Sequence, residues 1–165
     1  MIITCTKTAC QIKTKNTTLE IQLRGTANNQ SRFSINAVAL PGPGEYEVGE
    51  VFAEITPALA HFHLEDIVLV VRLDDEGSVT TADFEQLERV DVFLLSLKNN
   101  EWSDLEAALK ISSKIEPKAI ILTGLDDSSL LEKMASRSPQ AIETLKLAGK
   151  DLPEEGQHLY VMQSR

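Results

Sequence analysis

The stretch Pro-Gly-Pro-Gly-Glu-Tyr-Glu-Val-Gly-Glu-Val, residues 41–51, joins a rigid turn to the start of a strand. Proline restricts its own backbone, and glycine adopts conformations that other residues avoid, so Gly42 and Gly44 predict a tight turn. The alternating residues that follow predict a strand over 46–55. Glu45 begins that alternation, and we expect all three residues to serve the structure of the turn.

The chain on either side of this turn has the composition of β-structure. Before it, we predict strands at 2–12, 18–24 and 33–39, because these segments are rich in Ile, Thr and Leu or alternate in polarity. The polar segment 25–32 predicts an exposed loop. After the turn, the nearly continuous apolar run 67–71 predicts a strand that is buried on both faces.

The second half of the chain changes period and alternates helices with strands. Strands first, followed by mixed strands and helices, predict a single α+β domain over residues 1–165, in which a β-sandwich is flanked by helices. Residues 142–148 fit either a helix or a strand. The other predicted elements are helices at 83–89, 103–115 and 128–136 and buried strands at 92–97, 118–123 and 158–162.

Composition excludes several classes of protein. The chain has 165 residues, of which 42% are hydrophobic, and this suits one domain with a proper core. Its net charge of −9 argues against binding to nucleic acid or to an anionic membrane surface. We find no apolar run long enough to span a bilayer and no signal-peptide pattern, so we predict a cytoplasmic protein. Cys5 and Cys10, placed in one predicted strand, would point to opposite faces, and we expect two reduced thiols.

Several motifs, taken in order, resemble one known family. The turn at 41–51, the helix–strand–helix–strand order of 84–122 and the segment 150–156 before the last strand are similar to the zinc-hydrolase branch of the metallo-β-lactamase superfamily that includes ascorbate-6-phosphate lactonases. The predicted N-terminal strand pair is similar to the opening hairpin of that branch. This resemblance implies the αββα metallo-β-lactamase sandwich in a truncated form.

The resemblance also implies where zinc ligands would stand, and those positions differ here. The branch has Gly-His-Ser where this chain has Thr-Lys-Thr at residues 6–8, and it has a His-x-His-x-Asp-His run where residues 25–41 contain neither histidine nor acidic residues. The hairpin that carries an aspartate ligand is missing after residues 72–77, and Gly124 stands at the last ligand position. We therefore expect no metal or other cofactor, no catalysis, and a binding or assembly role as a homo-oligomer or in complex with a full-length paralogue.

One alternative keeps a metal. His61 and His63 are two residues apart on a predicted strand and share a face, and Asp66 follows closely. Two imidazoles and a carboxylate can bind zinc, so a displaced site for a metal-dependent hydrolase is the competing interpretation, completed by His158 or by a second subunit. The acidic run at 74–77 lacks the ligand spacing of a calcium loop and predicts a solvated turn.

Overall fold

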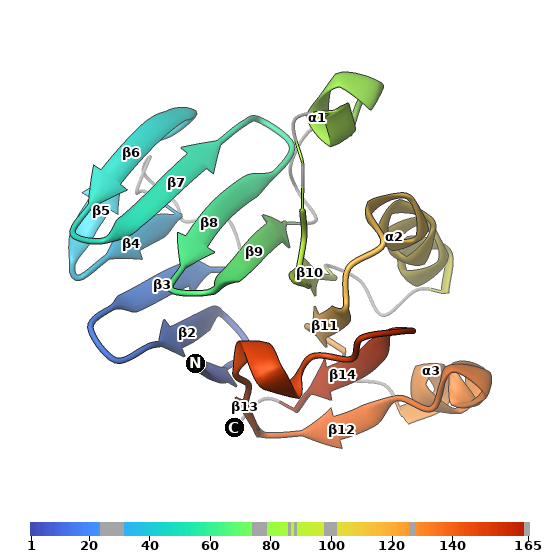
Figure 1. Cartoon of the computed structure of the whole chain (residues 1–165). Coiled ribbons are helices and arrows are strands. Elements are labelled where there is room, and N and C mark those ends of the chain that lie inside the picture. The colour runs from blue at the N-terminus through green and yellow to red at the C-terminus, as the bar shows by residue number, and fades with distance from the viewer. Residues whose placement is uncertain are drawn as a thin grey trace.

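The fold is given by a computed structural model (Figure 1) that describes residues 1–23, 32–73, 79–85, 87, 89–97, 102–125 and 128–163. The predicted loop at 25–32, apart from Arg32, and the acidic run at 74–77 lie outside the described residues. None of the described helices has the length and apolar character needed to cross a membrane.

Two β-sheets form the body of the molecule. The first sheet has the strand order β13-β1-β2-β3-β4-β5 and is antiparallel throughout. Its buried side chains alternate with polar ones along each strand, as one packed face and one solvated face require. Its strands are β1 (Ile2–Cys5), β2 (Ala9–Lys13), β3 (Thr18–Gln22), β4 (Phe33–Ile35), β5 (Val38–Leu40) and β13 (Thr144–Lys146).

The second sheet has the order β12-β14-β11-β10-β9-β8-β7-β6 and is mixed. Strands β9, β10, β11 and β14 run parallel, whereas β6, β7, β8 and β9 form an antiparallel meander. The parallel strands are buried on both faces, as their apolar runs predicted. The strands are β6 (Gly44–Val48), β7 (Val51–Ile55), β8 (Ala60–Leu64), β9 (Ile67–Arg72), β10 (Val92–Ser96), β11 (Ala119–Thr123), β12 (Gln140–Ile142) and β14 (His158–Met162).

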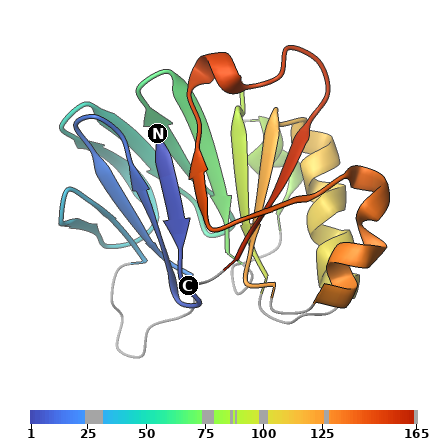
Figure 2. The same cartoon turned by 90° about the horizontal axis from the view of Figure 1, so that it is seen from below.

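The described helices pack on one face of the second sheet (Figure 2), and the first sheet packs on the other. One apolar cluster fills the space between the sheets, and a second joins α2 to the parallel strands. The predicted α+β sandwich is confirmed, and its truncation is visible in the polar, solvated outer face of the first sheet. The helices are α1 (Thr81–Glu85), α2 (Trp102–Ile115) and α3 (Ser128–Lys133), with short 3-10 turns η1 (Ala135–Arg137) and η2 (Gly149–Asp151).

Three predicted strands are in fact hairpins. The segments 2–12, 33–39 and 46–55 each contain a tight turn that reverses the chain, so each supplies two antiparallel strands. In the second of these, Asn36 and Ala37 both have positive φ, the geometry that two-residue hairpin turns favour. The ambiguous segment 142–148 contributes strand β13 and the last residue of β12.

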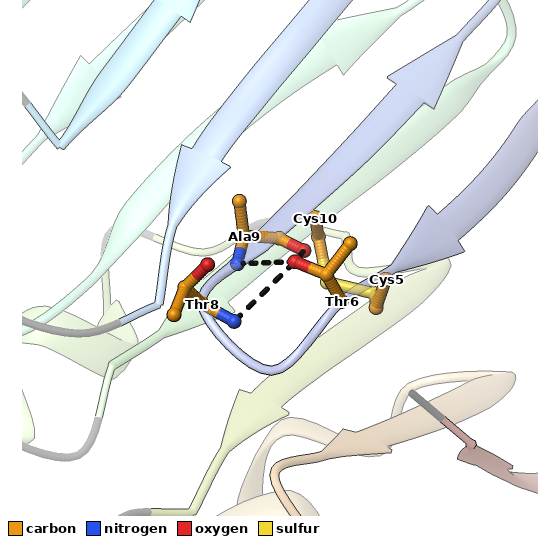
Figure 3. The surroundings of a disulfide bond; sticks show 5 residues. All are labelled: Cys5, Thr6, Thr8, Ala9 and Cys10. Atoms are coloured by element: carbon orange, nitrogen blue, oxygen red, sulfur yellow. Dashed lines mark hydrogen bonds between the residues drawn. A yellow bond between two sulfur atoms is a disulfide. The ribbon is translucent and has the colours of Figure 1, made fainter. Parts of the chain in front are cut away.

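The prediction for the two cysteines was wrong for the same reason. Residues 6–8 turn the chain, so Cys5 on β1 and Cys10 on β2 are direct cross-strand partners with Cα atoms 4.1 Å apart. Directly opposed residues point to the same face, and the two sulfur atoms form a disulfide (Figure 3). Both residues are buried in the cluster between the sheets.

Candidate functional site

The carboxyl ends of the parallel strands are where open α/β sheets usually bind ligands. In this chain β9, β10 and β11 are followed by Leu73, Leu97 and Gly124. Leu73 and Leu97 are buried in the two apolar clusters, one on each face of the sheet. Among the described residues, this end of the sheet therefore carries two buried leucines directly after β9 and β10, and a glycine after β11 at the last ligand position that the family resemblance implied.

Gly124 stands at the last ligand position that the family resemblance implies, and the backbone around it leaves no room for a side chain. Its φ is +86°, a backbone conformation that residues with a Cβ rarely adopt. A Cβ built on Gly124 would overlap the carbonyl oxygen of Leu97, a backbone atom that cannot rotate away. No side chain, and therefore no histidine, fits at this position without a movement of the backbone after β10.

The turn that takes the place of the family's Gly-His-Ser is organised by Thr6. The Thr6 Oγ1 accepts hydrogen bonds from the backbone N–H groups of Thr8 and Ala9 and donates one to the Ala9 carbonyl (Figure 3). The adjacent disulfide joins the two strands directly beneath this turn. The hydroxyl of Thr6 therefore serves the turn itself.

A different group of polar residues gathers on the helix-side face of the second sheet. Here β6, β7 and β8 extend beyond the helices, and we call this area the open face. Strand register places Glu54 directly opposite His61, and Phe52 directly opposite His63. Phe52 is 39% exposed. The open face comprises Glu45, Glu47, Phe52, Glu54, His61 and His63.

The predicted pairing of His61 with His63 is what the structure shows. Both rings project from β8 on the same face, with their centroids 4.8 Å apart. His61 is half-buried, and its Nε2 has no solvent exposure and no hydrogen-bond partner. Burial, and next the charge of His63, lower the pKa of His61 to about 4. His61 is therefore neutral near pH 7.

These two histidines line a cavity of about 460 Å³. Its other walls include Glu65 and Asp66 from the turn between β8 and β9, together with Val68 and Arg89. It is located near the amino ends of the parallel strands, at the opposite end of the sheet from Gly124, because His63 pairs with Val68 near the start of β9.

Asp66 and His158 do not join the histidine pair. Asp66 lines the same cavity as the two histidines, but its carboxylate lies against Gly149 of η2. His158 lies on β14, four strands from β8, which is about 19 Å at the usual spacing. Its Nδ1 is 3.2 Å from the Tyr160 hydroxyl, on the face that meets the first sheet. No three His, Cys, Asp or Glu side chains gather in a metal-binding arrangement within the described ranges.

Sequence reasoning missed Asp91, which organises the wall of the cavity. Its carboxylate is fully buried and accepts hydrogen bonds from the Val68 N–H, at 2.9 Å, and from Arg89 Nε and Nη2, at 2.9 and 2.7 Å. The Asp91 backbone also bonds to Val68 and Ala119, so this residue ties β9, β10 and β11 together. A single aspartate between two valines in an apolar run was the available signal.

Comparison with solved structures identifies the fold. A crystal structure from Thermotoga maritima, assigned to the Zn-dependent hydrolases of the metallo-β-lactamase superfamily, aligns with a TM-score of 0.74 and 17% identity over 98% of each chain. The chain therefore has the metallo-β-lactamase fold, and the resemblance found in the sequence is confirmed as far as the fold is concerned. Because both chains are covered almost completely, the shortened form of the fold is shared.

The other comparisons add little. A mutant of the CmlA β-hydroxylase aligns over 76% of this chain and 32% of its own, with 9% identity and a TM-score of 0.46, which is too weak a likeness to support an argument. No family sequence model matches the chain, and no curated protein matches it in sequence.

The zinc that the fold family implies does not fit the residues at the corresponding end of this sheet. A ligand cannot be placed at Gly124, and the positions after β9 and β10 hold buried leucines. No catalytic step through that metal can be derived from the described residues.

Proposed function

We propose that this chain is a metallo-β-lactamase-fold hydrolase homologue that has lost the family's zinc position and acts as a binding or assembly protein. The observation that carries the proposal is the close approach of the Leu97 carbonyl to Gly124, which leaves no room for a side chain at that position. The buried leucines at the ends of β9 and β10 support it, because apolar side chains neither bind zinc nor hold a reactive water.

The open face supports the binding half of the proposal. Phe52 is the exposed apolar side chain of this face, and it is flanked by Glu47 and His63 in the strand register, so a partner that docks here would bury it. Glu45 and Glu47 lie on β6, the edge strand of the second sheet, and their charges oppose pairing of β6 with the same strand of a second copy. A partner that covers this area would therefore contact Phe52 on the face of the sheet and would not add a strand beside β6.

The proposal covers two kinds of assembly, a homo-oligomer and a complex with a full-length paralogue. Light scattering during size-exclusion chromatography measures the first, and copurification from the native host measures the second. Phe52→Ser should weaken either assembly, whereas Ile2→Ser, which removes a similarly exposed apolar side chain from the first sheet, should not. Equal assembly of both variants would show that the open face is not the interface.

A hydrolase assay tests the catalytic half. The zinc-supplemented protein should hydrolyse neither phosphodiesters nor lactones above the rate of a heat-denatured sample. Turnover that is saturable in substrate and that a chelator abolishes would refute the loss of catalysis.

A further inference from the structure

The histidine pair on the open face has properties that its role in folding does not explain. A buried imidazole nitrogen without a hydrogen-bond partner is unfavourable, and folded proteins usually satisfy such atoms. Nε2 of His61 is one of these atoms, and its ring forms part of the wall of a cavity large enough to admit an ion with its water ligands.

The arrangement of the two rings suits chelation. Two nitrogens bound to one tetrahedral ion at about 2.1 Å lie roughly 3.4 Å apart. Ring centroids 4.8 Å apart on one face of β8 allow this separation after small changes in the side-chain torsions.

The surrounding charges favour a cation. Glu54 lies one strand from His61 and Glu45 lies two strands away, about 5 and 10 Å at the usual strand spacing. The guanidinium of Arg89 in the cavity wall contacts the buried Asp91 carboxylate at 2.7 Å, a partner that it shares with Lys118 at 3.9 Å.

We infer that His61 and His63 form a two-imidazole chelate for a divalent transition-metal ion, with water in the remaining coordination positions. The ions that imidazole prefers are Cu²⁺, Ni²⁺ and Zn²⁺. We assign Asp66 no part in the chelate, because it lines the cavity without forming a three-residue ligand group with the histidines among the described residues, and its carboxylate lies against Gly149. This site is at the opposite end of the sheet from the family's zinc position, so it does not depend on the proposed loss of that position.

The test is titration of the full chain, with any histidine tag removed and metals stripped by dialysis, with Cu²⁺, Ni²⁺ and Zn²⁺ in a calorimeter. We expect one ion per chain, with Cu²⁺ bound most tightly. His61→Ala and His63→Ala should each weaken binding at least tenfold. The matched controls His158→Gln and Asp66→Asn should stay within twofold of the unaltered protein.

The choice of variant and one spectroscopic measurement guard against effects of the substitutions on folding. Because His61 is half-buried, its substitution also changes packing, so the exposed His63 supplies the variant that leaves the fold intact. The electron paramagnetic resonance spectrum of the Cu²⁺ form should show coupling to two nitrogens, and to one in His63→Ala. Three results would overturn the inference: no saturable binding, unchanged affinity in His63→Ala, or a tenfold loss in Asp66→Asn, which would assign the ion to the three-residue site instead.

Discussion

Replacing Gly124 with alanine tests the contact that closes the family's last ligand position. Alanine at this position must keep the left-handed backbone conformation of Gly124, which costs roughly 1–2 kcal/mol. It must also push the Leu97 carbonyl away, and overpacking of this kind costs roughly another 1–3 kcal/mol. We therefore expect Gly124→Ala to lower the free energy of unfolding by about 2–5 kcal/mol, measured by urea denaturation at 25 °C.

Gly156 supplies the matched control for that experiment. Its φ is +83°, nearly the value at Gly124, yet no atom lies within 4 Å of a Cβ built on it. Gly156→Ala therefore has the backbone cost alone, and the difference between the two variants isolates the contact with Leu97. We expect Gly124→Ala to be at least about 1 kcal/mol worse than Gly156→Ala. Equal losses would show that the position has room for a side chain, and the argument against a ligand there would fail.

Three more predictions concern buried polar groups and the disulfide. The pKa of His61 is about 4 in the folded protein and near 6.5 when unfolded, so the unfolded chain gains a proton first as pH falls, and stability declines between pH 6.5 and 4. We expect this decline in the free energy of unfolding to be smaller in His61→Gln than in the unaltered protein. The expected difference is roughly 1–2 kcal/mol once the effect is reduced for solvent screening. Asp91→Ala should lose about 2–3 kcal/mol in urea denaturation, because it leaves the part-buried backbone N–H of Val68 and the guanidinium of Arg89 without this partner, and a loss below 1 kcal/mol would contradict the role of Asp91 in joining the strands. Reducing the disulfide between Cys5 and Cys10 should lower stability by about 2 kcal/mol from loop entropy, while a double alanine variant should not respond to reductant.

The sequence predicted strands well where one period continued and poorly where a short turn interrupted it. In residues 46–55 the apolar positions change from even numbers, ending at Val48, to odd numbers from Val51, and the prediction of a single strand did not use this break in phase. A two-residue turn at Gly49 reverses the chain and shifts the alternation, because directly opposed residues share a face. Val51 therefore packs on the same side as Val48, whereas one continuous strand would place them on opposite sides.

The candidate site was predictable to the extent that it depends on local spacing. His61 and His63 share a face because they are two residues apart on a strand, and the structure confirms this. The position of Asp66 depends on the β8–β9 turn and on Gly149, more than 80 residues later, which spacing cannot reveal. The same holds for Asp91 and Arg89, because their role becomes visible only when β9 and β10 lie side by side.

The zinc content of the double variant His61→Ala/His63→Ala tests together the loss of the family's zinc position and the histidine chelate. We propose that the family's metal position has no room for a ligand and that any bound ion lies on the open face. Elemental mass spectrometry of the gently purified, untagged variant should therefore find zinc at background level. Zinc near one equivalent per chain would contradict the account, because it would place a metal site elsewhere in the fold, with the family's position as the first candidate.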